Sequence, residues 1–217
     1  MKEFVSGNEK HENDETCEHD DVKLLEEVNS KEHEEAACRF CWSQEEPEDN
    51  PKICVCQCSG SVGYIHFSCL KAWMKTKVQE VRHGNSVSQT WKQFECELCK
   101  TRFPYAFKYR GKRWEMVDLH RPTSTETPYI IIESLSNDKN NSRFVHTIIV
   151  ENNKTEFKLG RGHESDLRVN DISVSRCHVL LKYKEGNFFL EDKKSKFGTL
   201  VLIRKFLPIE PTSQMAV

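Results

Sequence analysis

The chain has 217 residues, of which 37% are hydrophobic and 30% are charged, and its formal net charge is -2 at pH 7. This composition is typical of a soluble chain with one medium or two small domains, and it excludes a single large enzyme core. Because the charges nearly cancel, we expect no nucleic-acid partner. No run approaches the roughly 20 apolar residues of a membrane helix, so the sequence predicts no membrane span.

Residues 1–36 are acidic, with 13 Asp and Glu residues against 4 Lys and Arg residues, and they are poor in aromatic residues. Such a segment cannot bury enough apolar surface to fold by itself. We therefore predict an acidic disordered tail over residues 1–36, in which only Val22–Val28 could form a transient helix.

Residues 37–109 contain most of the 10 cysteines of the chain, in short pairs beside a histidine. This spacing is typical of metal ligands in a reducing compartment, so we expect an intracellular protein, cytoplasmic or nuclear. The pairs are Cys38-x-x-Cys41, Cys56-x-Cys58, His66-x-x-Cys69 and Cys96-x-x-Cys99. Eight ligands close two tetrahedral zinc sites, which are then structural and leave no open position. Cys54-x-Cys56 is an alternative middle pair.

Between these pairs, only LKAWMKTKVQEV (Leu70–Val81) has helical spacing of its apolar residues. The 26 residues between Cys69 and Cys96 also include Trp91. We therefore expect an extended helix there, followed by a second short element.

The sequence runs CRFC, CQCSGSVGYIHFSCLKAW and FECELC resemble the RING-CH (RING variant) finger of the membrane-associated RING-CH ubiquitin ligases, over residues 38–104. In that family the ligands interleave as a cross-brace. The resemblance implies one zinc on Cys38, Cys41, His66 and Cys69, and a second zinc on Cys56, Cys58, Cys96 and Cys99. Cys54 lies outside this register, because only Cys56 and Cys58 keep the family's distance to Ser-Gly-Ser.

The same resemblance implies a RING-type ubiquitin-protein transferase, with a ubiquitin-conjugating enzyme and ubiquitin as partners. Such a ligase carries no covalent intermediate, because it works by holding the charged conjugating enzyme in a reactive conformation. The residues expected to dock that enzyme are Phe40, Trp73, Lys100, Phe103 and Pro104. Trp73 and Phe103 could alternatively serve only to pack the small core.

Residues 110–128 mix Pro, Thr and charged residues without periodicity, which predicts a linker. Residues 129–217 contain short β-branched and aromatic runs separated by turn residues, which predicts a β-sandwich. The runs are YIIIESLS, RFVHTIIV, TEFKLG, DLRV, HVLLKYK, NFFLED and GTLVLI.

Three motifs in this half, Gly160-Arg161, Ser175-x-x-His178 and Ser195-x-x-Gly198-Thr199, resemble the forkhead-associated (FHA) domain. That family is a β-sandwich whose loops bind phosphothreonine. The resemblance implies phosphate contacts from Arg161, Ser175, Arg176 and Lys196, with His178 supporting the loop. Phe197 stands where the family has asparagine, so we expect weak preference for residues after the phosphothreonine. The strand runs are fewer than in a complete FHA sandwich, so we expect the last strands to be missing.

The predicted fold class is therefore α+β, with a cross-brace two-zinc RING-CH finger and an FHA-like β-sandwich. The leading functional hypothesis is a ubiquitin ligase that captures a phosphothreonine-containing protein. The alternative is a non-catalytic phosphopeptide-binding adaptor with a structural zinc finger. A zinc module that binds a peptide or histone tail also remains open, since plant homeodomain fingers share the ligand order.

Overall fold

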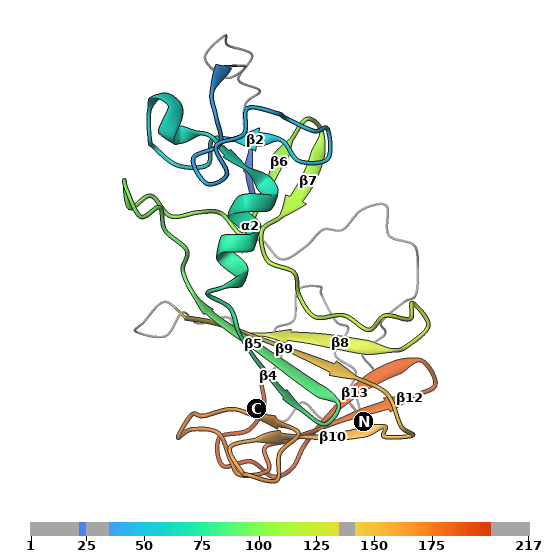
Figure 1. The fold of residues 1–217 in the computed structure, drawn as a ribbon. Helices are drawn as coiled ribbons and strands as arrows, with labels where there is room; N and C mark the ends of the chain where they lie inside the picture. The colour runs from blue at the N-terminus through green and yellow to red at the C-terminus, as the bar shows by residue number, and fades with distance from the viewer. Residues whose placement is uncertain (1–21, 25–34, 135–141, 201–217) are drawn as a thin grey trace, which may run out of the picture. The chain divides into compact units, whose positions relative to one another are not determined.

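The computed structural model describes residues 22–24, 35–134 and 142–200 of the chain (Figure 1). The described residues divide into two compact units, one ending at Asn153 and the other beginning at Lys154. The predicted tail, residues 1–36, lies outside the described residues except for residues 22–24 and 35–36. None of the helices in these described ranges is long and apolar enough to cross a membrane.

The first unit contains a short antiparallel pair, β2 (Lys52–Ile53) and β3 (Ile65–His66), with the 3-10 helix η1 (Gly60–Gly63) between them. Helix α2 (Phe67–Lys75) starts directly after β3 and buries Leu70 and Met74. The helix that we expected over Leu70–Val81 thus begins and ends earlier in the chain, because the residues after Val78 are extended.

A hairpin of β6 (Ala106–Tyr109) and β7 (Lys112–Glu115) covers one side of α2 (Figure 1). The ring of Phe67 at the start of α2 contacts Phe107 and Trp114 edge-on, with centroid distances of 5.9 and 4.8 Å. Strand β1 (Val22–Leu24) pairs in parallel with the outer edge of β6. Strand β7 lies inside the range that we predicted to be a linker.

A four-stranded sheet takes two of its strands from the long interval between Cys69 and Cys96 and the other two from residues after Cys96. Its strands are β4 (Gln79–His83), β5 (Ser86–Lys92), β8 (Tyr129–Glu133) and β9 (Ser142–Ile149), in the order β4-β5-β9-β8. The extended helix expected here is wrong, because the alternating run SVSQTWK forms β5 and buries every second side chain. Strands β8 and β9 fall in the range expected for the sandwich, yet β9 hydrogen-bonds to β5.

One hydrophobic core runs through the first unit, from two of the cysteine pairs to the four-stranded sheet. Its buried members include Cys38 and Cys96, Leu70 and Met74 of α2, and Val145 of β9. The small finger therefore shares its core with the sheet, which supplies apolar burial that a finger of this size lacks.

The second unit is built on the sheet order β11-β10-β12-β13. Its strands are β10 (Glu156–Gly160), β11 (Leu167–Arg168), β12 (Val179–Lys184) and β13 (Asn187–Asp192). Phe157, Leu167 and Leu181 are its most buried apolar side chains. The strand expected over GTLVLI lies partly outside the described residues.

Candidate metal centres and binding sites

The structure gathers eight cysteine and histidine side chains into two sets of four. The first cluster is Cys38, Cys41, His66 and Cys69, and the second cluster is Cys56, Cys58, Cys96 and Cys99. Within each cluster the ligand atoms all lie within 4.8 Å of one another. Each cluster joins two pairs distant in sequence, so the ligands interleave as the predicted cross-brace.

Two of the pairs sit in turns of the same geometry. The backbone N–H of Trp42 donates to the Cys38 carbonyl at 2.8 Å, and that of Lys100 donates to the Cys96 carbonyl at 2.9 Å. Trp42 and Lys100 both have positive φ, 64° and 59°. The turns aim both thiols of a Cys-x-x-Cys pair at one point, as a tetrahedral ion requires.

His66 is oriented for metal by its second nitrogen. Its Nδ1 lies 3.2 Å from the Cys41 Sγ, and its Nε2 lies 2.6 Å from the Glu45 carbonyl oxygen. The N–H at Nε2 donates to that carbonyl and leaves the Nδ1 lone pair free to bind the ion. The carbonyl thus sets the tautomer of the histidine.

The thiols of each cluster differ in acidity because their burial and their hydrogen bonds differ. Burial and the neighbouring Cys38 thiol raise the pKa of Cys69 to about 12. In the second cluster the Thr101 hydroxyl and backbone N–H lower the pKa of Cys99 to about 5, whereas burial and neighbouring thiols raise the pKa of Cys56 to about 12. Three thiolates in the first cluster and four in the second repel one another unless a cation balances their charge, so both donor sets fit Zn²⁺.

Cys54 belongs to neither cluster. Its Sγ lies near Gly63 instead, 3.1 Å from where a Cβ on that glycine would stand. The same Cβ would lie 2.8 Å from the Cys58 carbonyl oxygen. Gly63 is therefore required for the chain to pass closely over a second-cluster ligand.

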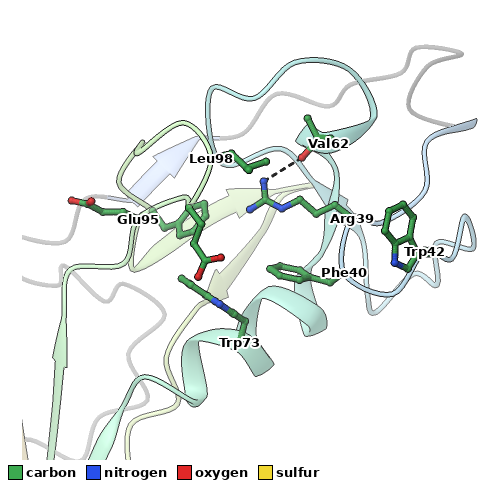
Figure 2. A pocket seen from close by; sticks show the side chains of 9 residues that line it. Arg39, Phe40, Trp42, Val62, Trp73, Glu95 and Leu98 are labelled. Atoms are coloured by element: carbon green, nitrogen blue, oxygen red, sulfur yellow. Dashed lines mark hydrogen bonds between the residues drawn. The ribbon is translucent and has the colours of Figure 1, made fainter.

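A pocket of about 280 Å³ is lined by residues that lie between the ligands of a Cys-x-x-Cys pair of each cluster, Phe40 and Leu98 among them (Figure 2). Three residues predicted for docking line it from three segments: Phe40 between the first ligands, Trp73 on α2 and Phe103 after the last ligand. Trp73 contacts Phe103 edge-on, with ring centroids 6.1 Å apart. Lys100 and Pro104 do not line the pocket; Lys100 is exposed and Pro104 is buried.

Sequence reasoning missed the other residues that line this pocket. They are Arg39, Trp42, Val62, Glu95, Glu97 and Leu98. Leu98 lies between the last two ligands as Phe40 lies between the first two, and that symmetry was a usable signal. The exposed fractions of Trp42 and Leu98 are 79% and 63%, so the pocket opens onto an apolar surface.

In the second unit, the predicted phosphate residues come from three loops that meet at Ser175. The Ser175 carbonyl accepts the Arg161 backbone N–H at 2.9 Å, and its hydroxyl oxygen accepts the Lys196 backbone N–H at 3.0 Å. The Arg176 carbonyl accepts from the Gly162 N–H at 2.9 Å. The cationic side chains of Arg161, Arg176 and Lys196 are exposed.

His178 braces this meeting point from the base of β12. Its Nδ1 accepts the Ser175 backbone N–H at 3.1 Å, so its Nε2 carries the proton and donates to the Gly198 carbonyl at 3.2 Å. A Cβ on Gly160 would lie 2.3 Å from the Arg176 carbonyl oxygen, so only glycine permits the approach. Phe197 is exposed, and the Lys196 ammonium lies over its ring at 5.2 Å.

Comparison with known proteins matches both sites. The family model for the RING-variant domain matches residues 38–99, and that for the FHA domain matches residues 157–213, which extend past the described residues. E3 ubiquitin-protein ligase MARCHF7 of Rattus norvegicus is 31% identical over 103 residues, 48% of this chain and 13% of that protein.

The ERAD-associated E3 ubiquitin-protein ligase DOA10 of Saccharomyces cerevisiae is 36% identical over 73 residues, 34% of this chain and 5% of that protein. E3 ubiquitin-protein ligase MARCHF6 of Homo sapiens is 38% identical over 72 residues, 33% of this chain and 6% of that protein. The chain thus spans a small part of these relatives. No solved structure matches it.

The fold class is confirmed as α+β with a cross-brace finger and an FHA-like strand-rich unit, and two four-ligand clusters match two zinc ions. The chain therefore carries a RING-variant domain at residues 38–99 and an FHA domain at residues 157–213.

Proposed function

We propose that this chain is a RING-type ubiquitin-protein ligase whose docking pocket receives a ubiquitin-conjugating enzyme. The observation that carries the proposal is the meeting of Phe40, Trp73 and Phe103 in one apolar pocket beside the zinc clusters. At about 280 Å³ the pocket lies near the lower end of the roughly 300–1,000 Å³ of small-molecule sites, and this volume suits one or two anchoring side chains of a partner protein.

Zinc bound in the two clusters supplies folding free energy and fixes the pocket walls, because each closed set of four leaves no position for a reacting group. The rate gain then comes from positioning, with the charged conjugating enzyme held so that its thioester is ready for attack. Lys100 is exposed directly after the last ligand, where its ammonium can reach both the enzyme and ubiquitin.

The FHA unit is proposed to bind a phosphothreonine-containing substrate or adaptor. Arg161, Ser175, Arg176 and Lys196 come together through the hydrogen bonds at Ser175, and their donors suit a dianionic phosphate. A ligase that holds its substrate on the same chain raises the local concentration of the acceptor lysine.

The docking proposal is tested by ubiquitin discharge from a panel of charged conjugating enzymes. Phe40→Ala should abolish discharge while two zinc ions per chain are retained, because it removes a pocket wall and no ligand. Phe197→Ala is the matched control, since Phe197 is also an exposed phenylalanine, 65% accessible, and lies in the FHA unit. Unchanged discharge in Phe40→Ala would favour the adaptor hypothesis.

The phosphate proposal is tested by calorimetry with a degenerate phosphothreonine peptide library and its unphosphorylated twin. Arg161→Ala should weaken binding about tenfold or more, since a hydrogen bond to a charged group contributes roughly 1.5–3 kcal/mol. Binding that does not depend on the phosphate would refute this part of the proposal.

A further inference from the structure

Arg39 lines the docking pocket (Figure 2), and its guanidinium also reaches the second cluster. Its Nη1 donates to the Val62 carbonyl at 3.2 Å and lies 3.5 Å from the Cys96 Sγ and 3.9 Å from the Cys58 Sγ. The residue follows Cys38, a ligand of the first cluster. One side chain thus extends from the first cluster to two ligands of the second.

The charges favour this placement. A divalent ion bound by four thiolates carries excess negative charge, and a guanidinium offers several N–H donors in a fixed plane. The guanidinium also lies over the ring of Phe40, with 5.4 Å from its central carbon to the ring centroid. A lysine ammonium, which is a single point, cannot contact two sulfurs, a carbonyl and a ring face in this way.

The other contacts of Arg39 are with walls of the docking pocket. Val62 and Phe40 both line the pocket, and Arg39 binds the first through its carbonyl and the second through its ring. The backbone N–H of Arg39 also donates to the Tyr64 carbonyl at 3.1 Å, just after η1. The guanidinium therefore connects two pocket walls that are far apart in sequence.

We propose that Arg39 is a positioning residue that ties the second cluster to the docking pocket: the thiolates of Cys58 and Cys96 hold the guanidinium, and the guanidinium holds Phe40 and Val62. This inference rests on the zinc occupancy and docking function proposed above. Its first readouts need neither ubiquitin nor a conjugating enzyme, so the two can fail separately.

The thiolate contacts are tested on the full chain loaded with Co²⁺ and with Zn²⁺. Hydrogen-bond donors stabilise thiolate lone pairs, so Arg39→Met should move the sulfur-to-cobalt charge-transfer band of the four-sulfur site to lower energy. Zinc affinity at that site should fall about tenfold, as is typical when an outer-shell partner is lost. Arg113→Met is the control, because Arg113 is an exposed arginine of the same unit and its ion pair, at 3.7 Å, is with Glu115, which does not line the pocket.

The pocket contacts are tested by NMR of the zinc-loaded chain. The Val62 methyl and Phe40 ring signals should shift in Arg39→Met and stay in place in Arg113→Met. Affinity for the conjugating enzyme should fall several-fold in Arg39→Met. If Arg39→Met does not fold, Arg39→Lys keeps the charge and should show intermediate values of each readout.

An unmoved charge-transfer band, or unmoved Val62 signals beside a moved band, would overturn the proposal. Wild-type chain that binds no conjugating enzyme would refute the docking function alone, with the cobalt and NMR readouts still deciding the role of Arg39.

Discussion

Two bulky residues adopt a backbone conformation that normally favours glycine. Trp42 and Lys100 follow the second cysteine of a Cys-x-x-Cys turn at φ 64° and 59°. Such a conformation costs on the order of 1 kcal/mol for a residue with a Cβ. Both side chains are exposed, and Trp42 lines the docking pocket.

Lys100→Ala should slow ubiquitin discharge about tenfold, while binding of the conjugating enzyme stays within about twofold of wild type. Lys100 lies outside the pocket, so its loss leaves the docking contacts intact. Alanine keeps a Cβ, so the backbone strain is the same and the difference reports the lysine side chain beyond Cβ. Single-turnover discharge and calorimetry separate the two quantities, and equal losses in both would place Lys100 in docking instead.

At the scale of elements, the β4-β5 hairpin is the largest departure from the expected finger. Trp91 of β5 is 3% exposed and packs against Tyr105 with ring centroids 6.3 Å apart. It belongs to the core that also holds Cys38 and Cys96. The hairpin therefore contributes to the core of both the finger and the sheet, because the buried indole of Trp91 belongs to that common core.

Trp91→Ala should lower the free energy of unfolding of the first unit by about 3–5 kcal/mol, because it leaves a large cavity in a packed core. Val81→Ala, on the exposed strand β4, should change it by less than about 0.5 kcal/mol. Urea denaturation in the presence of zinc measures both. A small loss in Trp91→Ala would mean that the sheet and the finger do not share a core.

The loop after β13 depends on Asp192, which accepts hydrogen bonds from the Ser195 hydroxyl at 2.6 Å and the Thr199 hydroxyl at 2.7 Å. These donors, with the Ser195 backbone N–H, lower the pKa of Asp192 to about 2. The folded pKa lies below the unfolded pKa, so the stabilisation is complete above about pH 4 and is lost as the pH falls towards 2.

The amide signals of Ser195 and Thr199 should therefore be constant at pH 5 and move between pH 4 and 2 in an NMR titration. In Asp192→Asn this titration should disappear. Movement centred near pH 4 in the wild type would show that these hydrogen bonds are not held in solution.

At the scale of the whole molecule, chelation should unfold one unit and spare the other. Structural zinc contributes on the order of 10 kcal/mol in small zinc peptides. Cys38 and Cys96 share a core with Trp91 and Val145. The amides of the four-stranded sheet should therefore lose their protection from hydrogen exchange together with those of the finger. Both clusters lie in the first unit. The amides of residues 154–200 should therefore keep their protection from hydrogen exchange.

Hydrogen exchange followed by mass spectrometry, before and after a strong chelator, reads both units in one experiment. Elemental analysis should find two zinc ions per folded chain before chelation. Persistent protection of β5 and β9 after metal removal would show that the sheet folds independently of zinc.

Local chemistry in the sequence determined a large part of this protein. The spacing within each Cys and His pair indicates metal ligands, and the structure gathers those eight residues in the predicted sets. Ser175-x-x-His178 is likewise a short motif, in which the His178 ring accepts the backbone N–H of the serine three residues earlier. Such features can be predicted from the sequence, because a Cys-x-x-Cys turn or a Ser-x-x-His hydrogen bond depends on residues a few positions apart.

Only the tertiary structure decided which strands pair across the chain and which side chains share the pocket. The run containing Val87 and Trp91 can be read as a strand, but its pairing with β9, more than 50 residues later, rests on burial in a common core. Arg39 and Val62 meet only because the cross-brace interleaves distant segments. Pairing and packing between distant segments depend on the free energy of the whole core, which no local pattern in the sequence carries.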